Sequence, residues 1–180
     1  MTTVQSFPPI AAPDATLLIL GSMPGRMSLQ RQQYYAHPRN AFWTVAGALF
    51  GFAPSLDYEA RKKALTDRRV ALWDVLRTCT RHSSLDSDIV EASVVANDFV
   101  TFFSRHPQLR LICFNGAKAE QSYRRYVLPG LDMTAREIPT VRLPSTSPAH
   151  ASMSTAQKLN VWREAMTGMG VELAMTSTEE

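Results

Sequence analysis

Four short apolar runs, separated by longer stretches with helical periodicity, restrict the fold of this chain more than any other feature of its sequence. The runs occupy residues 17–21, 70–73, 109–114 and 138–143. Runs this short and this apolar are typical of strands buried on both faces of a parallel sheet. We predict helices at residues 41–50, 58–68, 89–104, 117–127 and about 155–166. Strands that alternate with helices favour right-handed crossovers, so the predicted fold class is α/β: a three-layer α/β/α sandwich with a central, mainly parallel four-stranded sheet.

The length and composition indicate one domain. A chain of 180 residues, 45% of them apolar, can close one substantial core. We expect a single domain at residues 15–170, a flexible N-terminal extension at residues 1–14 and a C-terminal tail at residues 171–180. The sequence opens without a leader peptide and contains no apolar run long enough to span a membrane. We therefore expect a soluble monomer with no membrane partner, located in the cytoplasm and, in a bacterial cell, at the nucleoid.

The charge and the cysteines narrow the chemistry. A net charge of +3 and a pI near 9.1 make the surface mildly basic, which is compatible with nucleic-acid binding without demonstrating it. Cys79 and Cys113 lie far apart and outside any C-x-x-C spacing, so they support no disulfide framework, zinc site or iron–sulfur cluster. We expect no metal and no cofactor. The charged segment 60–69 is interpreted as a solvated helix face rather than a phosphate contact.

Polar residues follow each of the four predicted strands. In chain order they are GSMPG (21–25), Asp74, Asn115 with Gly116, and PSTSPAHA (144–151). In open α/β sheets ligands bind at the carboxyl ends of the strands. Each end has a structural explanation by itself, because Asp74 can cap a turn and Ser145 or Thr146 can cap a helix. The four together favour a binding site, and the chain has neither the G-K-[ST] sequence of a phosphate loop nor the G-x-S-x-G elbow of a serine hydrolase.

Four motifs in this order resemble the uracil-DNA glycosylase superfamily and, within it, the hypoxanthine-DNA glycosylase branch: GSMPG, YYAHPRNAFW (34–43), FNGAKA (114–119) and LPSTSPAHA (143–151). The resemblance spans residues 17 to about 165. It implies the sandwich fold of that superfamily and a monofunctional DNA glycosylase. Such an enzyme flips a deaminated base out of DNA and hydrolyses its N-glycosidic bond to leave an abasic site. The implied partner is DNA that contains deaminated bases, and no metal or cofactor is implied.

The resemblance assigns the catalytic water to Asn40. Relatives that act on mismatches carry an asparagine in the first motif, where this chain has Met23. In the hypoxanthine branch the asparagine of H-P-R-N-x-F-W takes that role, and it matches Asn40. We predict that its side-chain oxygen accepts a hydrogen bond from the attacking water and holds it below the anomeric carbon. The alternative is that Asn40 only caps the helix that begins at Ala41.

Asn115 is the second predicted catalytic residue, and we also predict that it binds the base. Its amide complements O6 and N1–H of hypoxanthine, although a turn before Gly116 is the alternative role. Uracil presents a similar pair of atoms, and an amide rotated by half a turn matches adenine, so neighbouring groups must fix the orientation. We predict further base contacts from Ser22, Met23 and one stacked aromatic ring, with Phe42 favoured over Tyr35.

The loop that follows the fourth strand is predicted to enter the minor groove beside the vacated base. The predicted DNA-binding residues are Pro144, Ser145, Thr146, Ser147, Pro148 and His150, together with the basic Arg39. Hydroxyl groups suit phosphate oxygens, and a proline suits a wedge against unstacked bases. Relatives begin this loop with a histidine that stabilises the departing base, where this chain has Leu143. His37 and His150 compete for that role, and a structural role is the alternative for each.

Three other functions fit the same sequence. A non-catalytic DNA-damage binding module fits because Met23 and Leu143 stand where relatives carry catalytic groups. A uracil- or mismatch-specific glycosylase fits because hypoxanthine, uracil and xanthine share part of the recognised edge. A glycosylase with lyase activity needs an amine nucleophile, for which Lys118 is the candidate, although we interpret it as a helix-surface residue.

Overall fold

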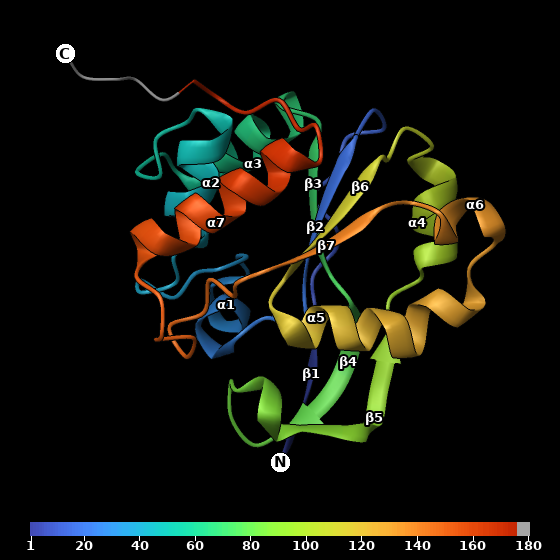
Figure 1. Ribbon diagram of the computed structural model, residues 1–180. Helices are drawn as coiled ribbons and strands as arrows, with labels where there is room; N and C mark the ends of the chain where they lie inside the picture. Colours follow the sequence, from blue (N-terminus) through green and yellow to red (C-terminus); the bar gives the residue numbers. More distant parts are fainter. Residues whose placement is uncertain (176–180) are drawn as a thin grey trace.

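A four-stranded parallel sheet forms the centre of the computed structural model, which describes residues 1–175 (Figure 1). The strand order is β3–β2–β6–β7, and all three neighbouring pairs are parallel. The bounds are β2 (Leu17–Gly21), β3 (Val70–Asp74), β6 (Leu111–Asn115) and β7 (Thr140–Leu143). Every residue of β2 and β3 is buried, as expected for strands covered on both faces. Each strand coincides with a predicted apolar run, and the predicted fold class is confirmed.

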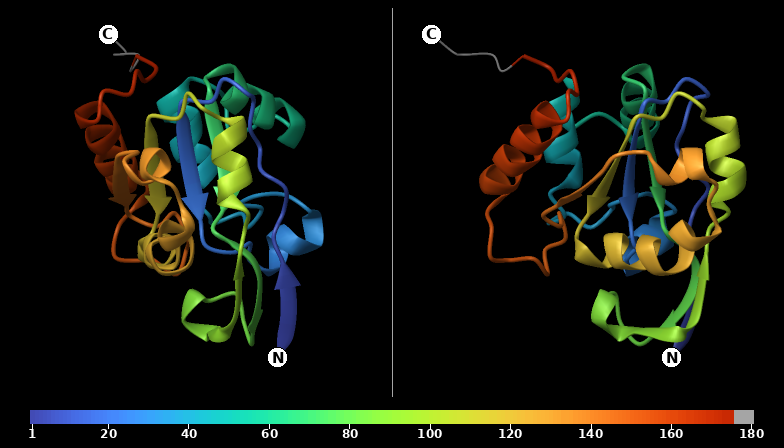
Figure 2. Two further views of the ribbon diagram at one scale, coloured as in Figure 1. Left: turned by 90° about the vertical axis from the view of Figure 1, so that its right-hand side faces the viewer. Right: turned by 45° about the vertical axis from the view of Figure 1, so that its right-hand side comes forward.

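Helices cover both faces of this sheet, so the fold has three layers (Figure 2). Helices α2 and α7 pack together on one side, and α4 and α6 lie on the other. The bounds are α1 (Arg26–Arg31), α2 (Phe42–Phe50), α3 (Tyr58–Asp67), α4 (Phe99–Arg105), α5 (Ala117–Ser122), α6 (Met133–Arg136) and α7 (Thr155–Gly168). Shorter helical segments are η1 (Asp86–Asp88), the π-helical η2 (Tyr123–Val127) and η3 (Leu128–Gly130).

Local capping explains where several predicted helices begin and end. Helix α3 begins after Asp57, whose carboxylate accepts a hydrogen bond from the Ala60 amide at 2.8 Å. Helix α7 begins with a capping box between Ser154 and Gln157. Helix α2 ends at Gly51, whose φ of 79° lies in the left-handed region that favours glycine. These helices therefore follow the local signals of the sequence.

One predicted helix is wrong. Residues 89–104, expected as a single helix, form strand β5 (Ile89–Ala96) and then helix α4. The first half is rich in β-branched residues, which favour a strand, and β5 pairs antiparallel with β4 (Leu76–Arg81). Asp98 separates the two elements, because its carboxylate caps α4 by accepting from the Thr101 amide at 3.0 Å.

The N-terminal extension is not loosely held, contrary to our expectation. Residues Thr2–Gln5 form strand β1, which pairs antiparallel with β4, so that a second sheet of order β1–β4–β5 lies below the first (Figure 1). The indole of Trp73 donates to the Phe7 carbonyl at 3.1 Å, and Ile10 bridges Leu72. At the other end of the chain, the Ala174 amide donates to the Leu49 carbonyl at 2.8 Å. The rest of the predicted tail, residues 176–180, lies outside the described residues.

Within residues 1–175, no helix has the length and apolar character needed to cross a membrane.

Candidate active site

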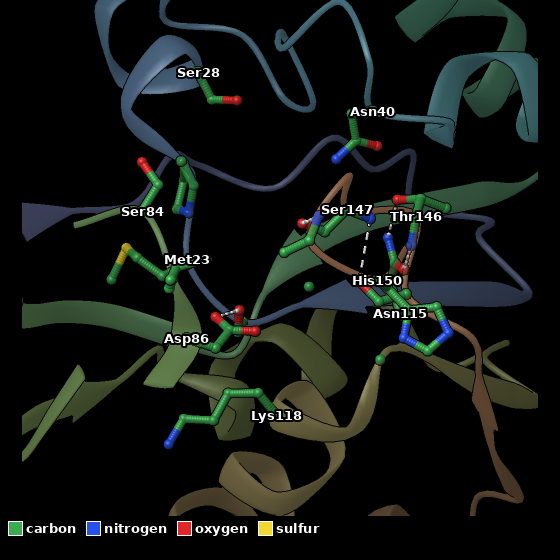
Figure 3. Close-up of a pocket in the computed structure, with 18 of the residues that line it drawn as sticks. Met23, Ser28, Asn40, Ser84, Asp86, Asn115, Lys118, Thr146, Ser147 and His150 are labelled. Carbon is green, nitrogen blue, oxygen red and sulfur yellow. Dashed lines mark hydrogen bonds between the residues drawn. The ribbon is translucent and has the colours of Figure 1, made fainter. Parts of the chain in front are cut away.

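A large pocket opens at the carboxyl ends of the parallel strands (Figure 3). Its volume is about 1120 Å³, which is room for a nucleotide and its flanking groups. All four sequence motifs contribute to its walls, as does a segment that we did not predict. The main lining segments are residues 21–28, Tyr34 to Asn40, Asp74, residues 84–87, residues 115–118 and residues 145–150. The fold thus gathers at one place polar groups that are far apart in the sequence.

Asn40 places its amide in this pocket. Its Oδ1 accepts a hydrogen bond from the Phe42 amide at 2.9 Å, and its nitrogen is turned toward the pocket interior (Figure 3). The backbone amide of Asn40 donates to the His37 carbonyl at 2.9 Å and closes the turn that carries the residue. The bond from the Phe42 amide supports the start of α2, although the N-cap residue of that helix is Ala41 and makes no side-chain cap hydrogen bond. An amide oxygen has two lone pairs, so this hydrogen bond orients the side chain and still leaves one acceptor position.

Asn115 is held in one orientation by Thr146. The Thr146 backbone amide donates to Asn115 Oδ1 at 2.9 Å, and Asn115 Nδ2 donates to Thr146 Oγ1 at 2.9 Å (Figure 3). A backbone N–H can only donate, so the atom that faces it must be the amide oxygen. Rotating the amide by half a turn would bring two donors together. Thr146 is therefore the neighbouring group that fixes the orientation of the Asn115 amide, and the sequence did not indicate it.

Thr146 also joins the two asparagines. Its carbonyl accepts from the Ala41 amide at 3.0 Å, directly beside Asn40. Thr146 lines the pocket, but it is 0% exposed and its hydroxyl already accepts from Asn115, so its contact with DNA stays a prediction. It is a brace between the loop after β7, the end of β6 and the start of α2.

This brace has a measurable consequence for stability. Thr146→Val keeps the shape of the side chain but removes the oxygen that accepts from Asn115 Nδ2. We expect the free energy of unfolding to fall by about 1–3 kcal/mol, the usual cost of leaving a buried polar group unpaired. Thr146→Ser is the matched control, because it keeps the hydroxyl and loses only a methyl group. Chemical denaturation measures both, and a valine variant as stable as the serine variant would contradict the brace.

The aromatic pair in the second motif is arranged in the opposite way to our prediction. Phe42, favoured as the residue that stacks on a base, is 0% exposed and does not reach the pocket. Tyr35 lines the pocket and stacks on Phe42, with ring centroids 4.1 Å apart and 22° between the planes. Phe42 therefore supports Tyr35 from behind. The φ of Tyr35 is 53°, an uncommon backbone conformation for a non-glycine residue.

Gly21 allows two oxygen atoms to converge at the end of β2. A Cβ on this residue would lie 2.5 Å from Oδ1 of Asp74 and 2.8 Å from the hydroxyl of Tyr35. Burial, and after it the negative charge of Asp86, raises the pKa of Asp74 to about 7, against the opposing effect of the Arg81 guanidinium. Burial and then the charge of Asp74 raise the pKa of the Tyr35 hydroxyl, so that it stays protonated. Asp74, which we considered as a turn cap, is thus a buried carboxyl group in the wall of the pocket.

The loop between β4 and β5 forms the wall that the sequence did not indicate. Asp86 in η1 accepts a hydrogen bond from the Ser22 hydroxyl at 2.6 Å, and Ser84 Oγ accepts from the Arg26 amide at 2.9 Å. Ser22 and Met23, the residues predicted to contact the base, both line the pocket. The Ser22 hydroxyl already donates its hydrogen bond to Asp86. The positions joined by this bond are 64 residues apart, which no local pattern reports.

The loop after β7 is built by its own hydroxyl groups. Ser145 Oγ accepts from the Ser147 amide and Ser147 Oγ accepts from the Ala149 amide, each at 3.2 Å. Of the residues predicted to bind DNA, all but one line the pocket: Ser145, Thr146, Ser147, Pro148, His150 and Arg39. Pro144 lies behind them, where its carbonyl accepts from the Trp162 indole at 2.9 Å. The buried Lys158 supports the loop by donating to the Ser147 carbonyl at 3.2 Å.

The remaining candidates have local partners. Nδ1 of His37 accepts from the Arg39 amide at 3.1 Å, which leaves the proton of a neutral ring on Nε2. Lys118 lines the pocket but forms an ion pair with Glu91, and it lies across the pocket from Asn40 (Figure 3). No group of three histidine, cysteine or acidic side chains suited to a metal ion occurs within the part of the chain that the structure describes.

Comparison with known proteins places this site in a family. The sequence matches the family model of the uracil DNA glycosylase superfamily over residues 8–166. It is 40% identical over 116 residues to the hypoxanthine DNA glycosylase of Methanosarcina acetivorans and 37% identical over 116 residues to that of Methanosarcina barkeri. Each match covers 64% of this chain and 72% of the relative.

The fold is also similar to that of a solved structure. The solution NMR structure of a proposed uracil DNA glycosylase from Methanosarcina acetivorans superposes with a TM-score of 0.73 at 35% identity, covering 91% of this chain and 98% of that chain. The resemblance drawn from the four motifs is confirmed: the chain belongs to the uracil DNA glycosylase superfamily.

Proposed function

We propose that this protein is a monofunctional DNA glycosylase that extrudes deoxyinosine from DNA and hydrolyses its N-glycosidic bond, leaving an abasic site. The observation that carries the proposal is the linkage of two pocket asparagines by Thr146, which bonds to the Asn115 amide and to the backbone beside Asn40. One amide is thereby oriented for a base edge and the other lies nearby for a water molecule. Membership of the superfamily, and relatives named hypoxanthine DNA glycosylase, support the same reaction.

Asn40 positions the attacking water in this proposal. Departure of the base leaves an oxocarbenium-like sugar, which reacts with a weak nucleophile that is well placed. Because the nitrogen of Asn40 is the atom turned toward the pocket, it donates a hydrogen bond to the oxygen of the water, in place of the predicted bond from the water to Oδ1, which the Phe42 amide holds. Capping and catalysis are therefore compatible roles, because the capping hydrogen bond fixes the amide that holds the water.

Asn115 reads the base and Tyr35 stacks on it. With its orientation set by Thr146, the Asn115 amide still has one N–H and one oxygen lone pair, which match O6 and N1–H of hypoxanthine. Adenine presents the reverse pattern at these positions and is rejected. Because one face of Tyr35 rests on Phe42, the base meets the remaining face of the ring. The loop residues Ser145, Ser147 and Pro148 contact the DNA strand at the pocket rim.

A panel of damaged oligonucleotides tests this function. We expect purified protein to release hypoxanthine from single- or double-stranded DNA, so that alkali then cleaves the strand at the former deoxyinosine. Deoxyuridine and deoxyxanthosine, each also paired with every base, complete the panel and measure base preference. Scission at deoxyuridine alone would reassign the substrate to uracil. Binding to deoxyinosine DNA without scission at any lesion would instead favour a non-catalytic damage-binding module.

A further inference from the structure

Two buried oxygen atoms in the pocket have no hydrogen-bond partner among residues 1–175. They are Oδ2 of Asp74 and the hydroxyl of Tyr35, which the Asn115 side chain approaches closely enough to lower the Tyr35 pKa without meeting hydrogen-bond geometry. Both side chains line the pocket, and the other carboxyl oxygen of Asp74, Oδ1, and the Tyr35 hydroxyl approach the same point beside Gly21. Leaving a buried polar atom unpaired is costly, so native proteins rarely do so without a functional reason. The pair is therefore a candidate site that a ligand completes.

A protonated carboxyl group at this point has a use in purine excision. The departing purine takes both electrons of the glycosidic bond and carries a negative charge unless a ring nitrogen gains a proton. Asp74 is buried, and its raised pKa of about 7 keeps a large fraction of it protonated near neutral pH. A buried carboxylic acid with such a pKa is suited to general acid catalysis.

We propose that Asp74 is a catalytic residue that donates its carboxyl proton to a ring nitrogen of the departing purine, N3 or N7, as the C1′–N9 bond breaks. This inference rests on the proposed function. The electron pair of the C1′–N9 bond goes to the base, and the carboxyl proton neutralises it. Water adds to C1′ and loses a proton, which restores the acid form of Asp74. The products are neutral hypoxanthine and an abasic sugar.

The groups that face Asp74 favour its neutral form. The hydroxyls of Tyr34 and Tyr35 stay protonated, because burial, and after it the charge of Asp74, raises the pKa of each. The carboxylate of Asp86 in η1 disfavours a second negative charge, and the guanidinium of Arg81 on β4 acts in the opposite direction. Burial is therefore the main reason that the pKa of Asp74 is raised, and the negative charge of Asp86 is the second reason.

Single-turnover excision of hypoxanthine, measured across neutral pH, tests the assignment. We expect the wild-type rate to fall as pH rises through about 7, because the protonated fraction of Asp74 falls. Asp74→Asn should be at least about 100-fold slower on the acidic side and should lose this dependence on pH. Asp88→Asn is the matched control, since it makes the same carboxyl-to-amide replacement outside the pocket lining. Asp88→Asn should keep both the wild-type rate and its decrease as pH rises through about 7.

Substrate analogues, tested on the wild-type protein, identify the atom that receives the proton. We expect the wild type to cleave either 3-deaza- or 7-deaza-deoxyinosine about as slowly as Asp74→Asn cleaves deoxyinosine, because that analogue lacks the acceptor nitrogen. Fast cleavage of both analogues by the wild type would overturn the proposal.

The possible failures are distinguishable. A wild type that leaves deoxyinosine intact would overturn the proposed function and this inference with it. An active wild type matched by Asp74→Asn in rate would overturn only the role of Asp74. An Asp74→Asn variant that is slower at every pH but keeps the wild-type pH profile would also overturn the role of Asp74, because it would show that the residue is only structural.

Discussion

Replacing Asn40 by alanine is expected to lower the single-turnover rate of hypoxanthine excision by at least about 100-fold, the scale of loss when a reacting group is no longer positioned. The affinity for the same DNA should stay broadly intact, because phosphate and loop contacts supply most of the binding. The reason is geometric. Asn40 lines the pocket and its Oδ1 is fixed by the Phe42 amide, so its removal leaves the water without a holder. Rapid-quench kinetics and fluorescence anisotropy measure the two quantities.

A serine at the same position separates catalysis from helix capping. Asn40→Ser retains a side-chain oxygen that can accept from the Phe42 amide, but this side chain is too short to hold the water as well. We expect Asn40→Ser to unfold at nearly the wild-type temperature and to be as inactive as Asn40→Ala. Wild-type excision rates in both variants would refute the role of Asn40. Loss of activity that is matched by loss of stability would point to capping as its sole contribution.

Gly21→Ala is also expected to cause a large loss of activity. The new Cβ would lie 2.5 Å from Asp74 Oδ1 and 2.8 Å from the Tyr35 hydroxyl, so at least one of these side chains must move. Neither moves freely, because Asp74 is buried and Tyr35 is stacked on Phe42. We expect the excision rate to fall by about 100-fold or more through misplacement of these groups. Overpacking should also lower the free energy of unfolding by about 1–3 kcal/mol.

Two other glycines serve as controls for this prediction. Gly168→Ala makes the same change at the end of α7, where a Cβ would meet nothing within 4 Å, and it should leave the rate unchanged. Within the first motif, a Cβ on Gly25 would meet only Ser84 at 3.9 Å, so Gly25→Ala should have a much smaller effect than Gly21→Ala. Equal losses in Gly21→Ala and Gly25→Ala would show that the motif needs glycine for its backbone and not for the approach of Asp74 and Tyr35.

The sequence by itself determined the central sheet and the location of the site. A strand buried on both faces must be apolar along its whole length, and the three runs that meet this requirement became β2, β3 and β6. The fourth run became β7, an edge strand in which Thr140 and Arg142 are exposed. The carboxyl ends of parallel strands meet at one edge of the sheet, so polar residues after each run indicated a common pocket. Asn40 and Asn115 both line that pocket, as the motifs had indicated.

Tertiary structure alone decided which neighbouring side chains face the pocket and in what state. Tyr35 and Phe42 belong to one aromatic run, but only Tyr35 lines the pocket, and its φ of 53° is a conformation that the sequence did not indicate. Thr146 looked like its serine neighbours in a polar loop, but its bonds to Asn115, 31 positions away, make it a brace. The raised pKa of Asp74 likewise exists only once the chain buries it near Asp86.

The second sheet also depends on tertiary contacts that the local sequence does not indicate. Residues 89–104 contain signals for both a helix and a strand, and pairing with β4 decided that the first half is a strand. Strand β1 pairs with residues more than seventy positions later, such as Thr2 with Arg81. Local periodicity and propensity report only on near neighbours in the chain. Pairing, burial and electrostatic surroundings depend on contacts between distant segments, and the folded chain alone brings those contacts into being.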